Sequence, residues 1–401
     1  MKQRYNFQTL RKAWVLVAFT TLFLSSCNNS NDDPDIPKDD YLVESSVITE
    51  LSKEQIVQQS AAISPLVAGF VRNGVKVYRL TYKTKNTDGS DITASGALIL
   101  PITTQNVAMV SVQHGTISSD DQAPSNFKAN SEGSTIGSLF GAMGYIIAYP
   151  DYIGYGASKD LPHPYEHRAS LASASLDMLR AAKEFLKKQT DVKWDERLYL
   201  AGYSEGGFAT LSLQKKIEEE ASSEFNLRAS SCGAGAYDKT AFMKYLINNE
   251  THGIAGFNSS YLWVTLTYDR IYGLNRPKSV YFKEPYAAQI EKLGKDDPIN
   301  VSFNTIFTES FIKGINDGTD TAFLNAVADN NVYDWKPRTP TQLYHGTADR
   351  LVFFFNSKNA YDAMTKRGAT NVTLIPVQNG DHDTSLSTYL LGTLTFFTST
   401  Q

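Results

Sequence analysis

The sequence predicts an α/β fold, in which a mostly parallel, doubly wound sheet is flanked by helices and interrupted by an inserted, mainly helical cap. A β-hairpin comes first, because two segments of alternating polarity flank an Asp88-Gly89 turn. Short apolar runs and helical stretches then alternate, which is typical of buried parallel strands and their crossover helices. A long aromatic-rich segment without a clean apolar strand interrupts this alternation later in the chain.

The elements of the predicted core follow in chain order. Residues 75–86 form the first strand of the hairpin, and ITASGALILP, which starts at Ile92, forms the second. Residues 168–189 place apolar side chains at helical spacing. The buried strands are the apolar runs 107–113, 145–150, 197–202, 341–346 and 372–377. We therefore expect a core in two parts, 46–236 and 337–401.

The N-terminus has the pattern of an export signal. Residues 1–26 combine a basic start with the apolar run Ala13–Leu24, which is too short to span a bilayer, where about 20 residues are needed. This segment ends in LSSC, which resembles a bacterial lipobox with Cys27 as the lipid-modified residue; a plain signal peptide is the alternative. The polar and acidic segment 27–45 that follows is expected to be a flexible tether.

Charge and cysteine content limit the partners. Removal of residues 1–26 takes away four positive and no negative charges, so the formal net charge changes from −4 to −8. An acidic chain without a basic cluster has little attraction for nucleic acid. If Cys27 is acylated, Cys232 has no disulfide partner in the chain, and we expect a buried thiol at a strand end. The anchor predicts an outer-membrane lipoprotein on the periplasmic or outer face; Asp32 and Asp33 loosely resemble a surface-export signal.

Residues 237–336, called the cap below, interrupt the predicted sheet. They are rich in aromatic residues and contain no clean apolar strand. Because the chain re-enters the sheet at TQLYHG, residues 341–346, an insertion is favoured over an independent second domain. Most of the aromatic side chains are expected to form the core of the cap, and the remainder to face a substrate.

The motif GYSEGG places Ser204 between the predicted strand 197–202 and a helix. Glycine also serves in an ordinary strand-to-helix turn, but a serine in this context is typical of a nucleophile elbow. Gly202 and Gly206 would let the chain turn sharply without side-chain clashes around the serine. The elbow lies at a helix N-terminus, whose free N–H groups face a developing oxyanion, so the backbone N–H of Glu205 is one natural donor.

Two later strand ends carry the partners that a serine nucleophile needs. Asp349 follows the strand 341–346 in HGTAD, and His382 follows the strand 372–377 in GDH. A histidine takes the serine proton as general base, and a carboxylate holds its imidazole in the required tautomer. Asp381 and Asp383 adjoin the histidine too closely to reach its ring. The other histidines are expected to be structural: His114, His163, His167, His252 and His345.

The GYSEGG elbow, the HGTAD turn and the GDH loop, in this order, together resemble the α/β-hydrolase superfamily. The cap and the segment YPDYIGYGAS make the chain similar to its secretory lipase/esterase branch, over about residues 65–400. This resemblance implies the α/β-hydrolase fold and a serine hydrolase that cleaves carboxylic esters through an acyl-enzyme, with Ser204, Asp349 and His382 as the catalytic triad. By resemblance to other HG-x loops, the backbone N–H of Thr116 is the second oxyanion donor, although QHGT departs from the HGGG pattern.

Two other functions stay open at this point. A serine peptidase on the same fold would use the same triad, and a surface lipoprotein that binds glycans or lipids could retain the fold without catalysis. The sequence contains no H-E-x-x-H, C-x-x-C or G-x-x-x-x-G-K-[ST] motif, so no metal and no cofactor are expected. The expected substrate is a small-molecule or lipid ester with a medium acyl chain or an aromatic acid, and Trp263 and Tyr268 are candidates for setting that preference.

Overall fold

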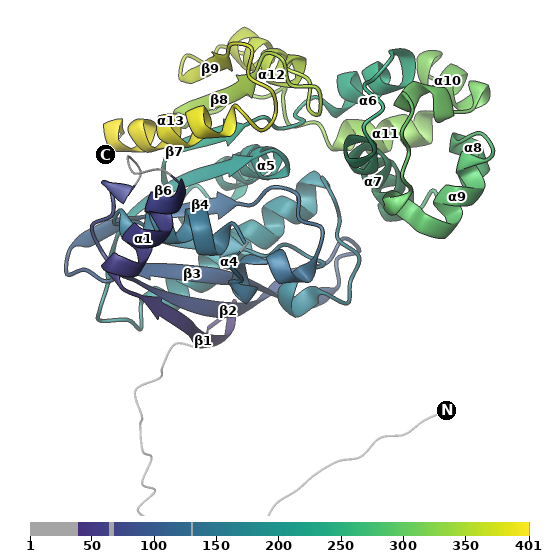
Figure 1. Ribbon diagram of the computed structural model, residues 1–401. Helices are drawn as coiled ribbons and strands as arrows, with labels where there is room; N and C mark the ends of the chain where they lie inside the picture. Colours follow the sequence, from purple (N-terminus) through teal and green to yellow (C-terminus); the bar gives the residue numbers. More distant parts are fainter. Residues whose placement is uncertain (1–38, 64–67, 130, 401) are drawn as a thin grey trace, which may run out of the picture. The chain divides into compact units, whose positions relative to one another are not determined.

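A mixed β-sheet forms the centre of the computed structural model, which describes residues 39–63, 68–129 and 131–400. Within these residues the sheet has nine strands in the order β1-β2-β3-β5-β4-β6-β7-β8-β9 (Figure 1). Strands β1, β2, β3 and β5 pair antiparallel, and all neighbours from β5 to β9 pair parallel. The predicted fold class is therefore confirmed. The predicted signal peptide, 1–26, and Cys27 lie outside the described residues.

The hairpin and the apolar runs form the strands that the sequence predicts. The hairpin consists of β2 (Val75–Lys85) and β3 (Asp91–Pro101), which pair in register from one end to the other. The five apolar runs correspond to β4 (Asn106–Gln113), β5 (Ile146–Pro150), β6 (Lys193–Tyr203), β8 (Thr341–Gly346) and β9 (Val372–Val377).

Two strands have no counterpart among the predicted strand ranges, although Cys232 was expected at a strand end. The edge strand β1 (Leu42–Leu51) begins inside the segment 27–45 that was predicted as a tether. Its side chains are largely exposed, so backbone pairing with β2 rather than an apolar pattern holds it in the sheet. Strand β7 (Asn226–Gly233) is rich in small polar residues, which also gives it a weak pattern. Near its end Cys232 is buried, as expected, and burial raises the pKa of its thiol to about 12.

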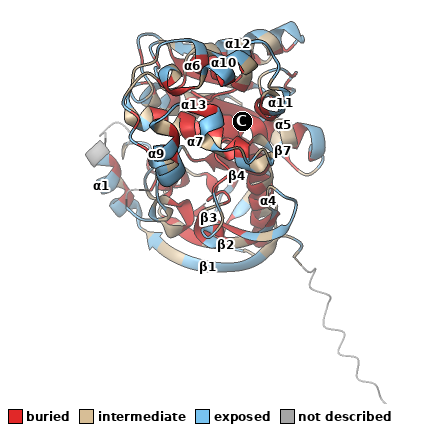
Figure 2. Cartoon of the chain, turned by 90° about the vertical axis from the view of Figure 1, so that its right-hand side faces the viewer, coloured by how far each residue is buried: buried red, intermediate tan, exposed pale blue. Residues whose placement is uncertain are grey.

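Helices cover both faces of the sheet. On one face α4 (Arg168–Leu186) and α5 (Glu205–Glu220) pack in a cluster that includes Leu98 of β3. On the other face α1 (Lys53–Ile63), α3 (Ser138–Ala142) and α13 (Leu386–Ser399) pack in a cluster that includes Ala97 and Ile99. Neighbouring residues of β3 thus point into opposite layers, as the pleat of a strand requires. Figure 2 shows the buried residues gathered on the sheet and on the helix sides that face it.

The chain between β7 and β8 is helical. It forms α6 (Lys239–Asn248), α7 (Ala255–Ile271), α8 (Lys278–Tyr281), α9 (Tyr286–Leu293), α10 (Glu309–Asn316) and α11 (Thr321–Asp329), which Figure 1 shows as one group. Most of their aromatic side chains belong to one buried cluster, in which the ring of Phe307 contacts those of Phe303 and Phe311. Helix α12 (Phe355–Lys366) then follows β8. In the described part of the chain, no helix combines the length and apolar character of a membrane span.

Candidate active site

Ser204 lies in a strained turn between β6 and α5. Its φ of 59° and ψ of −124° are unusual for a residue other than glycine, and such a conformation costs about 1–3 kcal/mol. Two backbone hydrogen bonds hold it: Ser204 N donates to Gly233 O at 2.9 Å, and Phe208 N donates to Ser204 O at 3.1 Å. A Cβ atom at Gly206 would lie 2.0 Å from the carbonyl oxygen of Gln113, so only glycine fits there. The turn has the geometry of the expected nucleophile elbow.

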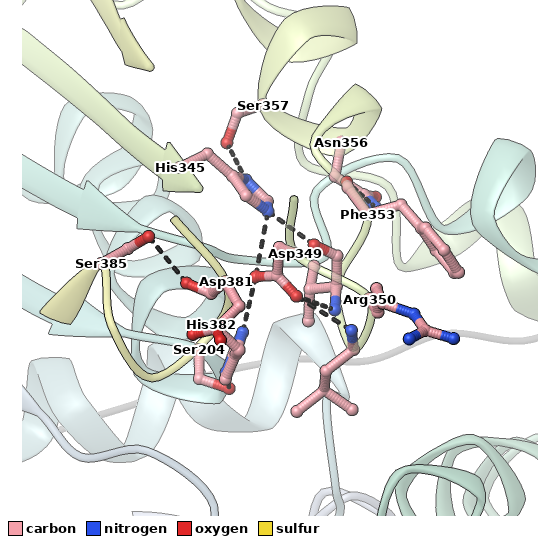
Figure 3. Close-up of polar contacts among 12 residues, drawn as sticks. Ser204, His345, Asp349, Arg350, Phe353, Asn356, Ser357, Asp381, His382 and Ser385 are labelled. Atoms are coloured by element: carbon pink, nitrogen blue, oxygen red, sulfur yellow. Dashed lines mark hydrogen bonds and ion pairs between the residues drawn. The ribbon is translucent and has the colours of Figure 1, made fainter. Parts of the chain in front are cut away.

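The structure brings Ser204, His382 and Asp349 together from three strand ends. His382 Nε2 lies 2.9 Å from Ser204 Oγ, and His382 Nδ1 lies 2.7 Å from Asp349 Oδ2 (Figure 3). With the Nδ1 proton donated to the carboxylate, Nε2 is free to accept the serine proton. An arrangement of this kind can turn a serine hydroxyl into a usable nucleophile.

The Asp349 carboxylate is buried, and both of its oxygen atoms have hydrogen-bond partners. Its Oδ1 atom accepts hydrogen bonds from the backbone N–H groups of Leu351 and Val352, both at 2.9 Å. Burial by itself raises the pKa of this carboxyl, but the hydrogen bonds with His345 and His382 outweigh it and lower the pKa to about 2. Asp349 is therefore ionised throughout the neutral range, as a group that stabilises an imidazolium must be.

His345 contributes a contact that the sequence did not reveal. It was expected only to pack at its strand end, yet its Nε2 atom lies 3.5 Å from Asp349 Oδ2 and 2.6 Å from Val352 O (Figure 3). Its Nδ1 atom lies 2.7 Å from Ser357 Oγ, so the ring is held on both sides. The sequence signal for this contact is the spacing of four residues between the histidine and the acid in HGTAD, at the end of a strand.

The remaining candidates lie apart from this chain of hydrogen bonds. His114 contacts the backbone oxygens of Gly115 and Asp151, at 2.7 and 3.1 Å. His163 Nε2 lies 2.8 Å from the buried carboxylate of Glu205. The Asp381 carboxylate accepts hydrogen bonds from its own turn, as expected for a turn residue. The contacts of the two other histidines are also local: His167 with Ser170, and His252 with Ile254 and Tyr261.

The two expected oxyanion donors lie on segments that border the serine. Glu205 is the first residue of α5, and the first N–H groups of a helix have no acceptor within the helix. Thr116 lines the same cavity as Ser204. Its loop is held by two hydrogen bonds, from Gly115 N to Glu132 Oε1 at 3.2 Å and between Thr116 Oγ1 and the Tyr165 hydroxyl at 2.9 Å.

A cavity of about 360 Å³ opens at the serine. Its wall is mainly apolar and comes from both the sheet side and the cap, with Phe140 and Leu390 on one side and Phe242 and Met243 on the other. Tyr268 also lines it. Trp263 lines a separate, open groove rather than this cavity, and it is stacked at 4.3 Å on Tyr165, which does line the cavity. Among the residues described, no group of three or more His, Cys, Asp or Glu side chains could hold a metal ion.

Comparison with known proteins identifies the family. A model of the secretory lipase family matches residues 125–399. The rice cell wall degrading esterase LipA from Xanthomonas oryzae is 26% identical, and the match covers 88% of this chain and 95% of that chain with a TM-score of 0.72. Candida antarctica lipase A in its closed state is 15% identical, over 90% of this chain and 82% of that chain with a TM-score of 0.64, so this likeness shows the fold alone. The curated proteins yielded no match. The chain therefore belongs to the secretory lipase family: it is a carboxylic ester hydrolase with the α/β-hydrolase fold.

Proposed function

We propose that Ser204 is the nucleophile of this ester hydrolase, with His382 as general base and Asp349 as the orienting acid. The observation that carries this proposal is the unbroken run of two hydrogen bonds, of 2.9 and 2.7 Å, from the serine hydroxyl through the imidazole to a buried, ionised carboxylate. The strained backbone of the serine supports it, because such strain is concentrated at functional residues.

The reaction has two stages, the formation of an acyl-enzyme and its hydrolysis. As Ser204 Oγ attacks the ester carbonyl, its proton passes to His382 Nε2 and a bond forms between Oγ and the carbonyl carbon. The N–H groups of Glu205 and Thr116 stabilise the oxyanion that develops. The alcohol leaves with the proton that His382 returns, and an acyl-enzyme remains. A water molecule then attacks the acyl carbonyl carbon as its proton passes to His382, the bond between Oγ and this carbon breaks, and the acid leaves as His382 returns the proton to Ser204 Oγ.

The apolar cavity selects the substrate. Its wall of aliphatic and aromatic side chains, which includes Tyr268, favours esters with medium acyl chains or aromatic acids over charged dipeptide amides. A volume of about 360 Å³ lies within the range of small-molecule sites. The substrate class is thus a small-molecule or lipid ester, and the cap, 237–336, supplies part of its binding wall.

Export agrees with membership in a family of secretory lipases. The lipobox-like LSSC supports a finer proposal, in which Cys27 carries the lipid and residues beyond it tether the enzyme to the outer membrane. Two or more acyl chains on one cysteine meet the requirement for stable anchoring.

Covalent labelling tests the nucleophile. We expect a small fluorophosphonate to label the wild type and Ser310→Ala, which changes an exposed serine on α10, but not Ser204→Ala. We expect Ser204→Ala to lose about 10⁴- to 10⁶-fold in turnover of 4-nitrophenyl butyrate while its melting temperature stays near that of the wild type. An alanine variant that kept more than a tenth of the activity would remove Ser204 from this role. Preference for peptide amides over every ester in a panel would instead support a peptidase.

A further inference from the structure

A buried ion pair lies in the wall of the mainly apolar cavity. Lys239, the first residue of α6, pairs with Glu166, which precedes α4. The two residues are only 3% and 6% exposed, and both line the cavity that Ser204 and His382 line. A charged pair in this position needs an explanation, because most of the wall is apolar and favours an apolar ligand.

Stability alone does not explain the pair. Burial lowers the pKa of Lys239 and raises the pKa of Glu166, and each charge only partly offsets this effect on the other. Replacing such a pair by apolar residues of similar volume is often neutral or stabilising. An ion pair that joins the cap to the core could therefore be an apolar contact without loss of stability.

The ammonium group of Lys239 has donors to spare. It carries three N–H donors, and among the described residues the structure gives it one acceptor, Glu166 Oε2. It also lies 4.4 Å from the centre of the Phe208 ring, one helical turn after the nucleophile. The pair is thus next to the elbow, and its unused donors belong to a side chain that lines the cavity.

The backbone of Glu166 is held in place by the cap. Its φ of 49° is uncommon for a residue other than glycine, and its carbonyl oxygen accepts a hydrogen bond of 2.9 Å from the Tyr268 hydroxyl. The backbone that carries the Glu166 carboxylate is therefore fixed before a substrate arrives, as a recognition site requires.

We propose that Lys239 and Glu166 form a specificity-determining subsite that binds a free hydroxyl group of the ester substrate. A hydroxyl accepts a hydrogen bond from the ammonium and donates one to the carboxylate, so it matches both members. The carboxylate repels an anionic substituent, and an alkyl group leaves the ammonium donors unpaired. The inference rests on the proposed function, since it places the substrate in the cavity of Ser204.

The subsite is tested with pairs of esters that differ only in whether the chain ends in a hydroxyl or a methyl group. On the acyl side we would compare 4-nitrophenyl 6-hydroxyhexanoate with 4-nitrophenyl heptanoate, and on the alcohol side 4-hydroxybutyl butyrate with pentyl butyrate. The measured quantity is the ratio of kcat/KM for the hydroxyl ester to that for its methyl partner. We expect the double variant Glu166→Leu/Lys239→Met to lower this ratio by about tenfold or more in one series, as loss of a hydrogen bond to a charged group implies.

The change in this ratio distinguishes recognition of the hydroxyl group from a merely structural role of the ion pair. A loosened cap would slow both members of a matched pair alike and leave the ratio unchanged. The control is Arg276→Met, which breaks an ion pair with Asp320 in the same cap, away from the residues that line the cavity, and should not change the ratio. An unchanged or higher ratio for the double variant in both series would overturn the subsite.

The wild type alone provides a second test, which does not depend on whether a variant folds. With the subsite, its hydroxyl esters should be turned over at least as well as their methyl partners in one series; a preference of more than tenfold for methyl in both would overturn the inference.

Fluorophosphonate labelling distinguishes failure of the proposed nucleophile from failure of the subsite. A wild type that is not labelled at Ser204 contradicts the proposed nucleophile, whereas a labelled and active enzyme without the hydroxyl effect contradicts the subsite alone.

Discussion

Asp349→Asn replaces the carboxylate of the site with a group of nearly the same shape. In the wild type Oδ1 accepts two backbone N–H groups and Oδ2 lies 2.7 Å from His382 Nδ1. The amide oxygen of asparagine would keep the two backbone hydrogen bonds, which directs its NH₂ group at the imidazole. Nδ1 must then accept a hydrogen bond, so the proton moves to Nε2 and points at Ser204 Oγ. An imidazole in this tautomer cannot take the serine proton.

The expected loss is large because the change affects the chemical step. In serine hydrolases, a wrong tautomer at this position lowers kcat by about 10⁴-fold, which corresponds to about 5 kcal/mol of transition-state stabilisation. KM should change little, because Asp349 is not among the residues that line the cavity. The buried amide keeps its backbone partners, so the fold should survive.

The assay is kcat and KM for 4-nitrophenyl butyrate at pH 8, with the melting temperature as a check on folding. Asp381→Asn is the matched control, because its amide oxygen can still accept the N–H groups of its own turn. We expect this control and Asp383→Asn to stay within a few-fold of the wild type. Retention of more than about a hundredth of kcat by Asp349→Asn, or an equal loss in Asp381→Asn, would refute the assignment of the acid.

Three further changes have defined outcomes. Gly206→Ala should destabilise the fold by about 3 kcal/mol or more, because its Cβ would meet Gln113 O at 2.0 Å, whereas Gly256→Ala, with open space around it, should not; urea unfolding measures both. The pKa of Asp349 is lowered to about 2, so its ionised form contributes about 2 kcal/mol of stability above pH 4. This contribution should fade as the pH falls toward 2, and with it the stability difference from Asp349→Asn in acid unfolding curves. Cys27→Ser should move the protein from the membrane to the soluble fraction, and a variant that remains membrane-bound would contradict the lipid anchor.

The proposed catalytic residues were predictable because each is specified locally. Ser204 follows a run of buried apolar residues and is flanked by glycines, so the strand, the turn and the helix can be recognised in a short window. Asp349 and His382 follow the next recognisable strands, and parallel strands bring their carboxyl ends to one edge of a sheet. Long buried strands such as β4 and β6 were predictable for the same reason, since their cores consist of apolar residues.

The sequence by itself thus determined the fold class, the positions along the chain of the strands with strong apolar patterns, and the residues at their ends. Only the tertiary structure decided which other side chains meet at the site. His345 contacts Asp349, Lys239 meets Glu166 across 73 positions of the chain, and Trp263 lines a groove apart from the cavity of Ser204. The contact of His345 with Asp349 follows from the turn that comes directly after β8, whereas the positions of Lys239 and Trp263 depend on how the cap packs on the core. That packing is the sum of many weak apolar contacts, and no single motif encodes it.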